Sequence, residues 1–171
     1  VLNYCMADSN ITSFLGNHDL YLLYLINTNQ AKGELKKVVE AENSSEIFEW
    51  LIKRPMLIQI SDQSTQKEFI VTHAGIPEIW SIEKAVHLAE EVSKALNTDP
   101  SKILKVMWGN DPNSWDECLT DDDRYRVVIN YMTRMRFLGN SASLDLKNTS
   151  TKASAGFKPW FEYASESYKQ K

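Results

Sequence analysis

The chain has 171 residues, of which 43% are hydrophobic, 11% aromatic and 25% charged, close to globular averages, so disordered and low-complexity classes are excluded. Nineteen Lys and Arg against 23 Asp and Glu give a net charge of −4, which argues against a surface that binds nucleic acid by neutralising its phosphates. The longest apolar stretch, residues 20–26, is far shorter than the ~20 residues that cross a bilayer. With only Cys5 and Cys118 available, we expect reduced thiols, as in a cytoplasmic protein. From the charge and the short apolar stretch we expect neither a nucleic-acid nor a membrane partner. No obligatory protein partner is inferred.

The first residues, Val1-Leu2-Asn3-Tyr4, are typical of the last turns of an amphipathic helix and follow no initiator methionine. The far end closes without a structural stop signal. We therefore expect an internal part of a longer protein, with residues 1–171 forming the central part of a single domain.

Elements in the first third of the chain follow from short apolar runs. Residues 11–15 predict a buried strand that feeds a loop at Gly16, and residues 20–26 predict the start of a buried helix. Residues 27–42 are polar and indicate a surface excursion. Asn43 with Glu46 three residues on is a capping-box pattern, which opens a helix over 46–53 that Pro55 stops.

The middle of the chain predicts a hairpin followed by helices. Strands over 56–60 and 69–72 are joined by a polar stretch, and the second strand runs into His73. Ser81 caps the clearest helix, whose apolar residues recur at helical spacing as far as Leu96. Asp99 and Pro100 open a short helix that ends at Gly109.

The last third predicts one helix, a second hairpin and a loop. Thr120 and Asp123 form another capping pair before a helix that reaches Arg134. Residues 136–138 and 144–146 suggest a second hairpin, and residues 147–156 a mobile loop. Helices and strands that alternate in this way indicate a mixed α/β layered fold, not a bundle or an all-β sandwich.

Three histidines are candidates for chemistry. His87 lies on the polar side of a predicted helix and is typical of a solvated surface residue. His18 and His73 each follow a predicted strand in a loop that contains a glycine, the position where catalytic groups of layered α/β proteins gather. A hydrogen-bonded turn histidine is an equally simple interpretation of His73.

The tetrapeptide Gly16-Asn17-His18-Asp19 is a sharper candidate. Asn17 offers an uncharged oxygen that can bind a divalent cation, while His18 points elsewhere because adjacent side chains diverge in an extended segment. Asp19 would meet the positive end of the dipole of the next helix. The alternative is an ordinary turn, since Gly, Asn and Asp are turn residues.

The order of several motifs identifies a resemblance. Gly16-Asn17-His18-Asp19 and Val71-Thr72-His73-Ala74-Gly75 resemble the third and fourth signature motifs of the calcineurin-like metallophosphoesterases. Within that superfamily the chain is similar to the bacterial symmetrical bis(5′-nucleosyl)-tetraphosphatases, the diadenosine tetraphosphatases. The stretches that narrow the match are Trp50 to Pro55, Met107 to Trp115, Asn130 to Phe137 and Phe157 to Phe161.

This resemblance implies a fold and a reaction. The fold would be the family's αββα sandwich, two mixed sheets flanked by helices, incomplete at both ends of this chain. The reaction would be metal-dependent hydrolysis of a dinucleoside polyphosphate, diadenosine tetraphosphate, to two ADP, with two divalent cations. Manganese is the usual ion, and cobalt or another divalent ion is an alternative. Such a pair lowers the pKa of a bridging water and stabilises an in-line displacement.

Motif by motif, the resemblance also implies site residues. Asn17 and His73 would be metal ligands, and His18 the general acid that protonates the departing oxygen, a role that suits an imidazole near neutral pH. Arg134 and Arg136 would bind the polyphosphate, because a guanidinium matches two phosphate oxygens at once. Ordinary surface ion pairs are the alternative for these two arginines.

The chain also departs from the family pattern. The motifs Gly-Asp-x-His-Gly and Gly-Asp-x-x-x-Arg-Gly, which supply the other metal ligands, do not occur before Gly16, and no late Gly-His motif follows Phe161. We therefore expect the chain alone to be inactive. Two alternatives stay open: a phosphoprotein phosphatase of the same superfamily, and a non-catalytic truncated paralogue that acts as a binding piece.

Overall fold

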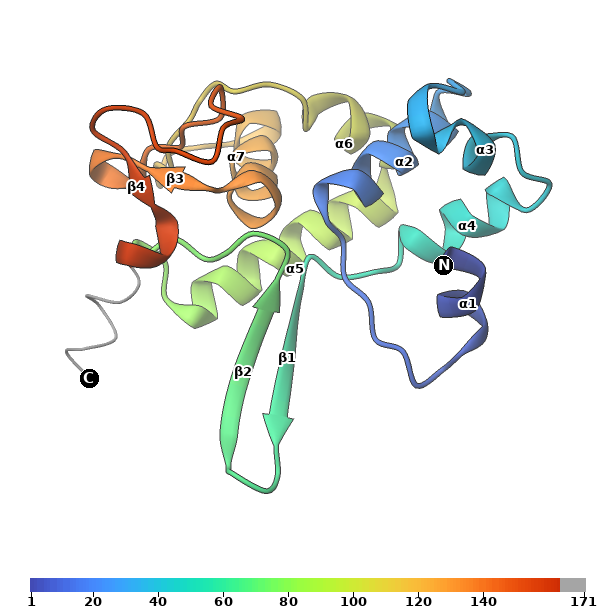
Figure 1. The fold of residues 1–171 in the computed structure, drawn as a ribbon, viewed down its shortest axis with the longest axis horizontal. Helices are drawn as coiled ribbons and strands as arrows, with labels where there is room; N and C mark the ends of the chain where they lie inside the picture. The colour runs from blue at the N-terminus through green and yellow to red at the C-terminus, as the bar shows by residue number, and fades with distance from the viewer. Residues whose placement is uncertain (164–171) are drawn as a thin grey trace.

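A computed structural model of the chain describes residues 1–163 (Figure 1). Its first half contains α1 (Leu2–Ala7), α2 (Asn17–Asn27), η1 (Gly33–Leu35), α3 (Lys36–Val39), α4 (Ser44–Leu51), β1 (Leu57–Asp62) and β2 (Lys67–Thr72). Its second half contains α5 (Ile82–Thr98), α6 (Pro100–Val106), α7 (Asp121–Arg134), β3 (Phe137–Leu138), η2 (Asn140–Ala142) and β4 (Lys158–Pro159).

The helices build the core. α5 runs through the middle of the molecule and packs on α6 and α7, while α2 packs on α4 and α6 (Figure 1). Each of these helices contributes apolar side chains at helical spacing to one continuous cluster, which excludes water from their shared interface. Its fully buried members include Leu20, Leu23, Leu88, Leu96, Ile103, Leu104, Val127 and Met132.

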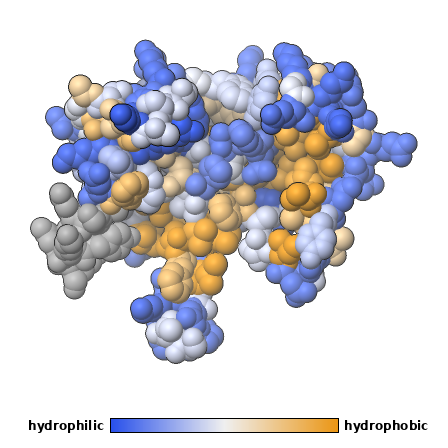
Figure 2. All heavy atoms as spheres, in the orientation of Figure 1, coloured by the Kyte–Doolittle hydropathy of each residue, from blue (hydrophilic) through white to orange (hydrophobic). Residues whose placement is uncertain are grey.

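The described residues form two separate antiparallel sheets of two strands each. β1 and β2 make a hairpin whose register runs from Leu57 opposite Thr72 to Asp62 opposite Lys67. This hairpin projects away from the helices (Figure 1), and in Figure 2 the surface near its base is hydrophobic while its tip is polar. β3 pairs with β4, and Figure 1 shows this second sheet to the left of α7.

Most predicted elements are confirmed, including the opening helix, the first hairpin and the helices after Ser81, Pro100 and Thr120. The helix predicted over 46–53 is α4, which begins and ends two residues earlier. Two caps form as predicted: the Ser81 Oγ accepts from the Lys84 N–H at 3.2 Å, and the Asp99 Oδ1 accepts from the Lys102 N–H at 3.0 Å.

The strand predicted over 11–15 is wrong, because that segment has no strand partner among the described residues. Its backbone is tied to the rest of the protein by a bond from the Leu15 N–H to the Pro55 carbonyl at 2.8 Å. The predicted loop at Gly16 is also shorter than expected, since Asn17, His18 and Asp19 form the first turn of α2. Successive side chains there diverge by the ~100° rotation of a helix and not by the alternation of an extended segment.

The second predicted hairpin forms only in part. Leu138 and Leu144 make an isolated bridge, but the strand partner of β3 is β4, from residues 158–159. The predicted loop over 147–156 does lack helices and strands.

The described residues therefore form a mixed helix-and-strand fold in which helices make most of the core. Nowhere in residues 1–163 is a helix both long and apolar enough to span a membrane.

Candidate functional site

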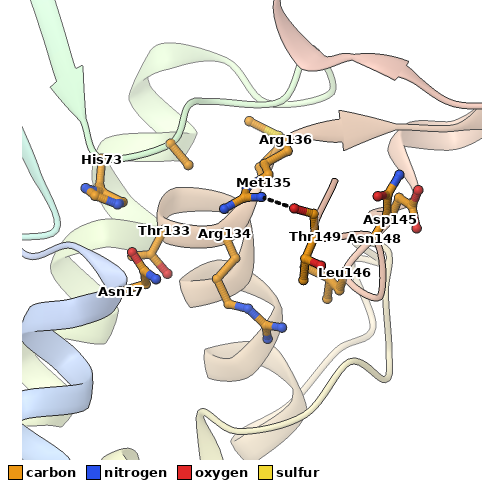
Figure 3. A pocket seen from close by; sticks show the side chains of 11 residues that line it. Asn17, His73, Thr133, Arg134, Met135, Arg136, Asp145, Leu146, Asn148 and Thr149 are labelled. Atoms are coloured by element: carbon orange, nitrogen blue, oxygen red, sulfur yellow. Dashed lines mark hydrogen bonds between the residues drawn. The ribbon is translucent and has the colours of Figure 1, made fainter. Parts of the chain in front are cut away.

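A pocket of about 400 Å³ lies where the start of α2, the end of β2 and the end of α7 meet. Asn17, His73, Arg134 and Arg136 all line it. Figure 3 shows Asn17 and His73 on the left of the pocket, the two arginines in the centre, and the loop that carries Asp145 and Thr149 on the right. Four of the five predicted site residues therefore share one pocket.

Asn17 is held by the N-terminus of α2. The Asp19 Oδ2 accepts a hydrogen bond from the Gly16 N–H at 2.8 Å, and its carboxylate lies in the first turn, near the positive end of the helix dipole. This bond fixes the backbone of Gly16, the residue directly before Asn17. The side chain of Asn17 is half-buried and faces the pocket.

His73 follows directly on β2 and is fixed by its two neighbours. The Thr72 hydroxyl donates to the Met132 carbonyl at 3.1 Å, and the Ala74 N–H donates to the same carbonyl at 2.8 Å. The end of β2 is thereby joined to the last turn of α7. The His73 ring packs against Gly16, so the segments that carry Asn17 and His73 are in contact.

Arg134 and Arg136 flank the buried Met135 at the end of α7. Met135 is buried in the core and has an extended backbone, and it lines the pocket together with the arginines on either side of it. The exposed Arg136 donates to the Thr149 carbonyl at 3.2 Å, the contact drawn in Figure 3.

Three hydrogen bonds fix the guanidinium of Arg134. Its Nη1 donates to the Gly109 carbonyl at 3.1 Å and to the Asn130 Oδ1 at 2.9 Å, and its Nη2 donates to the Asn110 Oδ1 at 2.9 Å. All of these partners are uncharged, and burial lowers the pKa of Arg134 below its ordinary value. The ion pairs found in residues 1–163 involve neither Arg134 nor Arg136, so the alternative of surface ion pairs is not realised there.

His18 lies beside the pocket and not in its lining. It is exposed in the first turn of α2, between Asn17 and Asp19. Its role as the general acid stays a prediction, since the pocket that would hold the leaving group is adjacent to it but not formed by it. His87 is exposed on α5, as predicted.

The donor set of the pocket fits one part of a metal site. An amide oxygen from Asn17 and an imidazole nitrogen from His73 are ligand types that manganese and cobalt accept. In the part of the chain that the structure describes, no group of three or more His, Cys, Asp or Glu side chains could hold a metal. Asn17 and His73 are therefore two candidate ligands in this pocket.

Sequence reasoning missed other members of the site. Asn130 is fully buried and holds Arg134, and its spacing of four residues from Arg134 on a predicted helix could have identified it. Asp145 and Thr149 also line the pocket. They lie in or next to an irregular loop, where the sequence carries no periodic signal.

Comparison with known proteins shows what this chain is similar to. No protein-family model matches it. The symmetrical bis(5′-nucleosyl)-tetraphosphatase of Marinomonas sp. is 38% identical over 167 residues, which are 91% of this chain and 57% of the relative. The protein of the same name from Pseudomonas fluorescens is 41% identical over 94% of this chain and 57% of its own length. The one from Azotobacter vinelandii is 38% identical over 92% of this chain and 58% of its own length.

The chain spans a little over half the length of these curated relatives, and the match runs through nearly all of the chain. The resemblance indicated by its motifs is thereby confirmed: the chain is a homologue of the symmetrical bis(5′-nucleosyl)-tetraphosphatases.

Proposed function

We propose that this chain is part of a symmetrical bis(5′-nucleosyl)-tetraphosphatase that hydrolyses diadenosine tetraphosphate to two ADP. One observation carries the proposal: a single pocket combines two metal-ligand types, Asn17 and His73, with two arginines that have no acidic partner among the described residues. The names of the relatives supply the substrate class.

The two arginines would bind the polyphosphate. Within residues 1–163, Arg134 uses three of its five N–H donors, all on uncharged partners, which leaves its charge and its other donors for an anion. Arg136 is exposed, and among the described residues its side chain has one hydrogen-bond partner, the Thr149 carbonyl. Guanidinium groups in such a setting bind phosphate oxygens through charge-assisted hydrogen bonds.

Asn17 and His73 would hold a divalent cation, manganese or a similar ion, as part of a two-metal centre completed by residues outside this chain. When bound, such a centre supplies Lewis-acid polarisation of the phosphoryl group and a water of lowered pKa. His18, exposed beside the pocket, would donate a proton to the departing ADP oxygen.

We further propose that residues 1–171 belong to one domain of calcineurin-like metallophosphoesterase fold, the αββα sandwich. In that fold the hairpin of β1 and β2 would join a larger sheet. The apolar pairs Ile60–Phe69 and Ile58–Val71, which share one face of the hairpin, support this proposal.

A chimera tests the function. This chain replaces the matching segment of the Pseudomonas fluorescens relative, and hydrolysis of diadenosine tetraphosphate is followed by chromatography with manganese present. We expect two ADP as products, and His18→Ala should lower kcat by about 10²–10⁴-fold. His73→Ala should weaken activation by manganese, whereas His87→Ala, on a helix surface away from the pocket, is the matched control and should change little.

Either of two results would contradict the proposal. A folded chimera that hydrolyses a phosphopeptide faster than the dinucleotide would indicate a phosphoprotein phosphatase. A folded but inactive chimera would indicate a non-catalytic paralogue.

A further inference from the structure

Trp108 carries an unusually exposed aromatic ring. Its residue is 45% exposed, although it follows directly on the buried Met107 at the end of α6. The ring is not loose, because it stands edge-to-face against Tyr21 at 5.8 Å and Tyr24 at 5.3 Å between ring centroids. Two tyrosines from α2 thus hold a large aromatic surface in contact with solvent.

The first link between this surface and the pocket runs along α2. Tyr21 lies four residues after Asn17, and residues at this spacing are neighbours on one face of a helix. Asn17 lines the pocket, and Tyr21 touches Trp108. The aromatic surface therefore begins one helical turn from the pocket.

The second link runs through Arg134. The Gly109 carbonyl, on the residue after Trp108, accepts from the Arg134 Nη1 at 3.1 Å and from the Asn130 Nδ2 at 3.2 Å. Neighbouring Cα atoms are about 3.8 Å apart, so the backbone of Trp108 adjoins the guanidinium group.

The loop that carries Trp108 is also fixed from its other side. The Trp108 carbonyl accepts from the Arg126 Nε at 3.0 Å, and the Asp111 carbonyl accepts from the Arg126 Nη1 at 2.9 Å. The position of the ring relative to Arg134 is thereby determined by hydrogen bonds and not by a free loop.

We propose that Trp108 and Tyr21 form a binding site for the purine base of a nucleotide whose phosphates are held at Arg134. This inference rests on the proposed function, because it takes the phosphate site as given and adds a place for the base. Adenine, the base of the substrate proposed above, fits this site, because the π-face of a base stacks on an aromatic side chain and the phosphates of a nucleotide lie within one nucleotide's length of its base. The site adds specificity for nucleotides over inorganic phosphates.

Paired ligands separate the base from the phosphates. Inorganic pyrophosphate and ADP share the diphosphate, and only ADP carries a base. Their affinities for the 171-residue chain are measured by calorimetry with manganese present, and circular dichroism verifies the fold of every variant. Trp108→Ala should lower the affinity for ADP about five- to tenfold and leave the affinity for pyrophosphate unchanged. Trp108→Phe should restore most of the ADP affinity.

A matched control comes from the first hairpin. Phe69→Ala removes an aromatic ring of similar exposure, 48%, far from α2 in the sequence and outside the pocket, and should affect neither ligand. Arg134→Ala should lower the affinity for ADP and for pyrophosphate alike.

Any other result contradicts either the base site or the phosphate site. If the native chain binds ADP no better than pyrophosphate, or if Trp108→Ala weakens both ligands equally, the base site is wrong while the phosphate site stands. If the folded native chain binds neither ligand, the phosphate site fails and the base site fails with it.

Discussion

Gly16 and His73 fit together because Gly16 has no side chain. A Cβ built on Gly16 would lie 2.6 Å from the His73 Nδ1 and 2.8 Å from its Cε1, closer than real side-chain contacts. The φ of Gly16 is −107°, which any residue can adopt, so glycine is required by space and not by backbone conformation. The close approach brings the two predicted metal-ligand segments together.

The first prediction follows from this contact. Gly16→Ala should lower the free energy of unfolding by about 1–3 kcal/mol, because the added methyl group must displace the imidazole. In a His73→Ala background the same change should cost clearly less, since the ring is gone. Urea denaturation of the four proteins gives the double-mutant cycle, in which the small capping difference between glycine and alanine cancels. An equal cost in both backgrounds would contradict the contact.

Local signals predicted the helices well because helical periodicity and caps depend on residues close in sequence. The helix after Ser81 is one example: its apolar spacing and its cap are both present in the structure. The strand over 11–15 is the opposite case, because a strand depends on a partner elsewhere and the sequence does not reveal which one exists.

Side-chain capping was less predictable than the helices themselves. The Asn43 Nδ2 donates to the Asn3 Oδ1 at 2.9 Å and makes no cap bond with α4, because a distant asparagine offers an alternative partner. The grouping of the site residues could be predicted only through the family resemblance. Spacing in the sequence cannot bring Asn17 near Arg134, and the helix that carries His18 turns it away from the pocket lining.

The second prediction compares two helix caps. Ser81→Ala should destabilise the protein by about 1 kcal/mol, because its Oγ accepts from the Lys84 N–H at the start of α5. Thr120→Ala at the start of α7 should cost no more than about 0.5 kcal/mol, since the Thr120 side chain makes no cap bond there. Both residues are exposed, so packing contributes little to either value. Thermal and urea unfolding measure the difference, and equal losses would show that the cap assignment is wrong.

The third prediction concerns the buried hydroxyl of Tyr131. It donates to the Ala142 carbonyl at 2.6 Å and accepts from the Trp115 N–H at 3.2 Å. Tyr131→Phe removes the hydroxyl from both the Ala142 carbonyl and the Trp115 N–H. It should lower the free energy of unfolding by about 1–3 kcal/mol at neutral pH. Unfolding in urea at pH 7 provides the value.

The same hydroxyl makes the stability of the protein depend on pH. Burial disfavours the phenolate and raises the pKa of Tyr131 from 10.0 to about 12. A folded-state pKa above the unfolded value means that this contribution to stability is complete below pH 10 and is lost as the pH rises from 10 through 12. The free energy of unfolding of the native chain should fall more steeply in this window than that of Tyr131→Phe. Parallel slopes would contradict the assignment.

The fourth prediction concerns one face of the first hairpin. Ile60 and Phe69 are directly opposite each other in the register, and they are 46% and 48% exposed. Ile58 and Val71 pair two residues further along on the same face. An exposed apolar face on a two-stranded sheet with free edges is a site of self-association.

Phe69→Lys should therefore slow the aggregation of the chain, measured by light scattering at several concentrations. The control is Gln59→Lys, which adds the same charge on the opposite face of β1 because side chains alternate along a strand. If both variants slow aggregation equally, net charge and not the apolar face governs it. If Phe69→Lys alone does so, the association runs through the face formed by Ile60 and Phe69, the same surface that a larger sheet would bury.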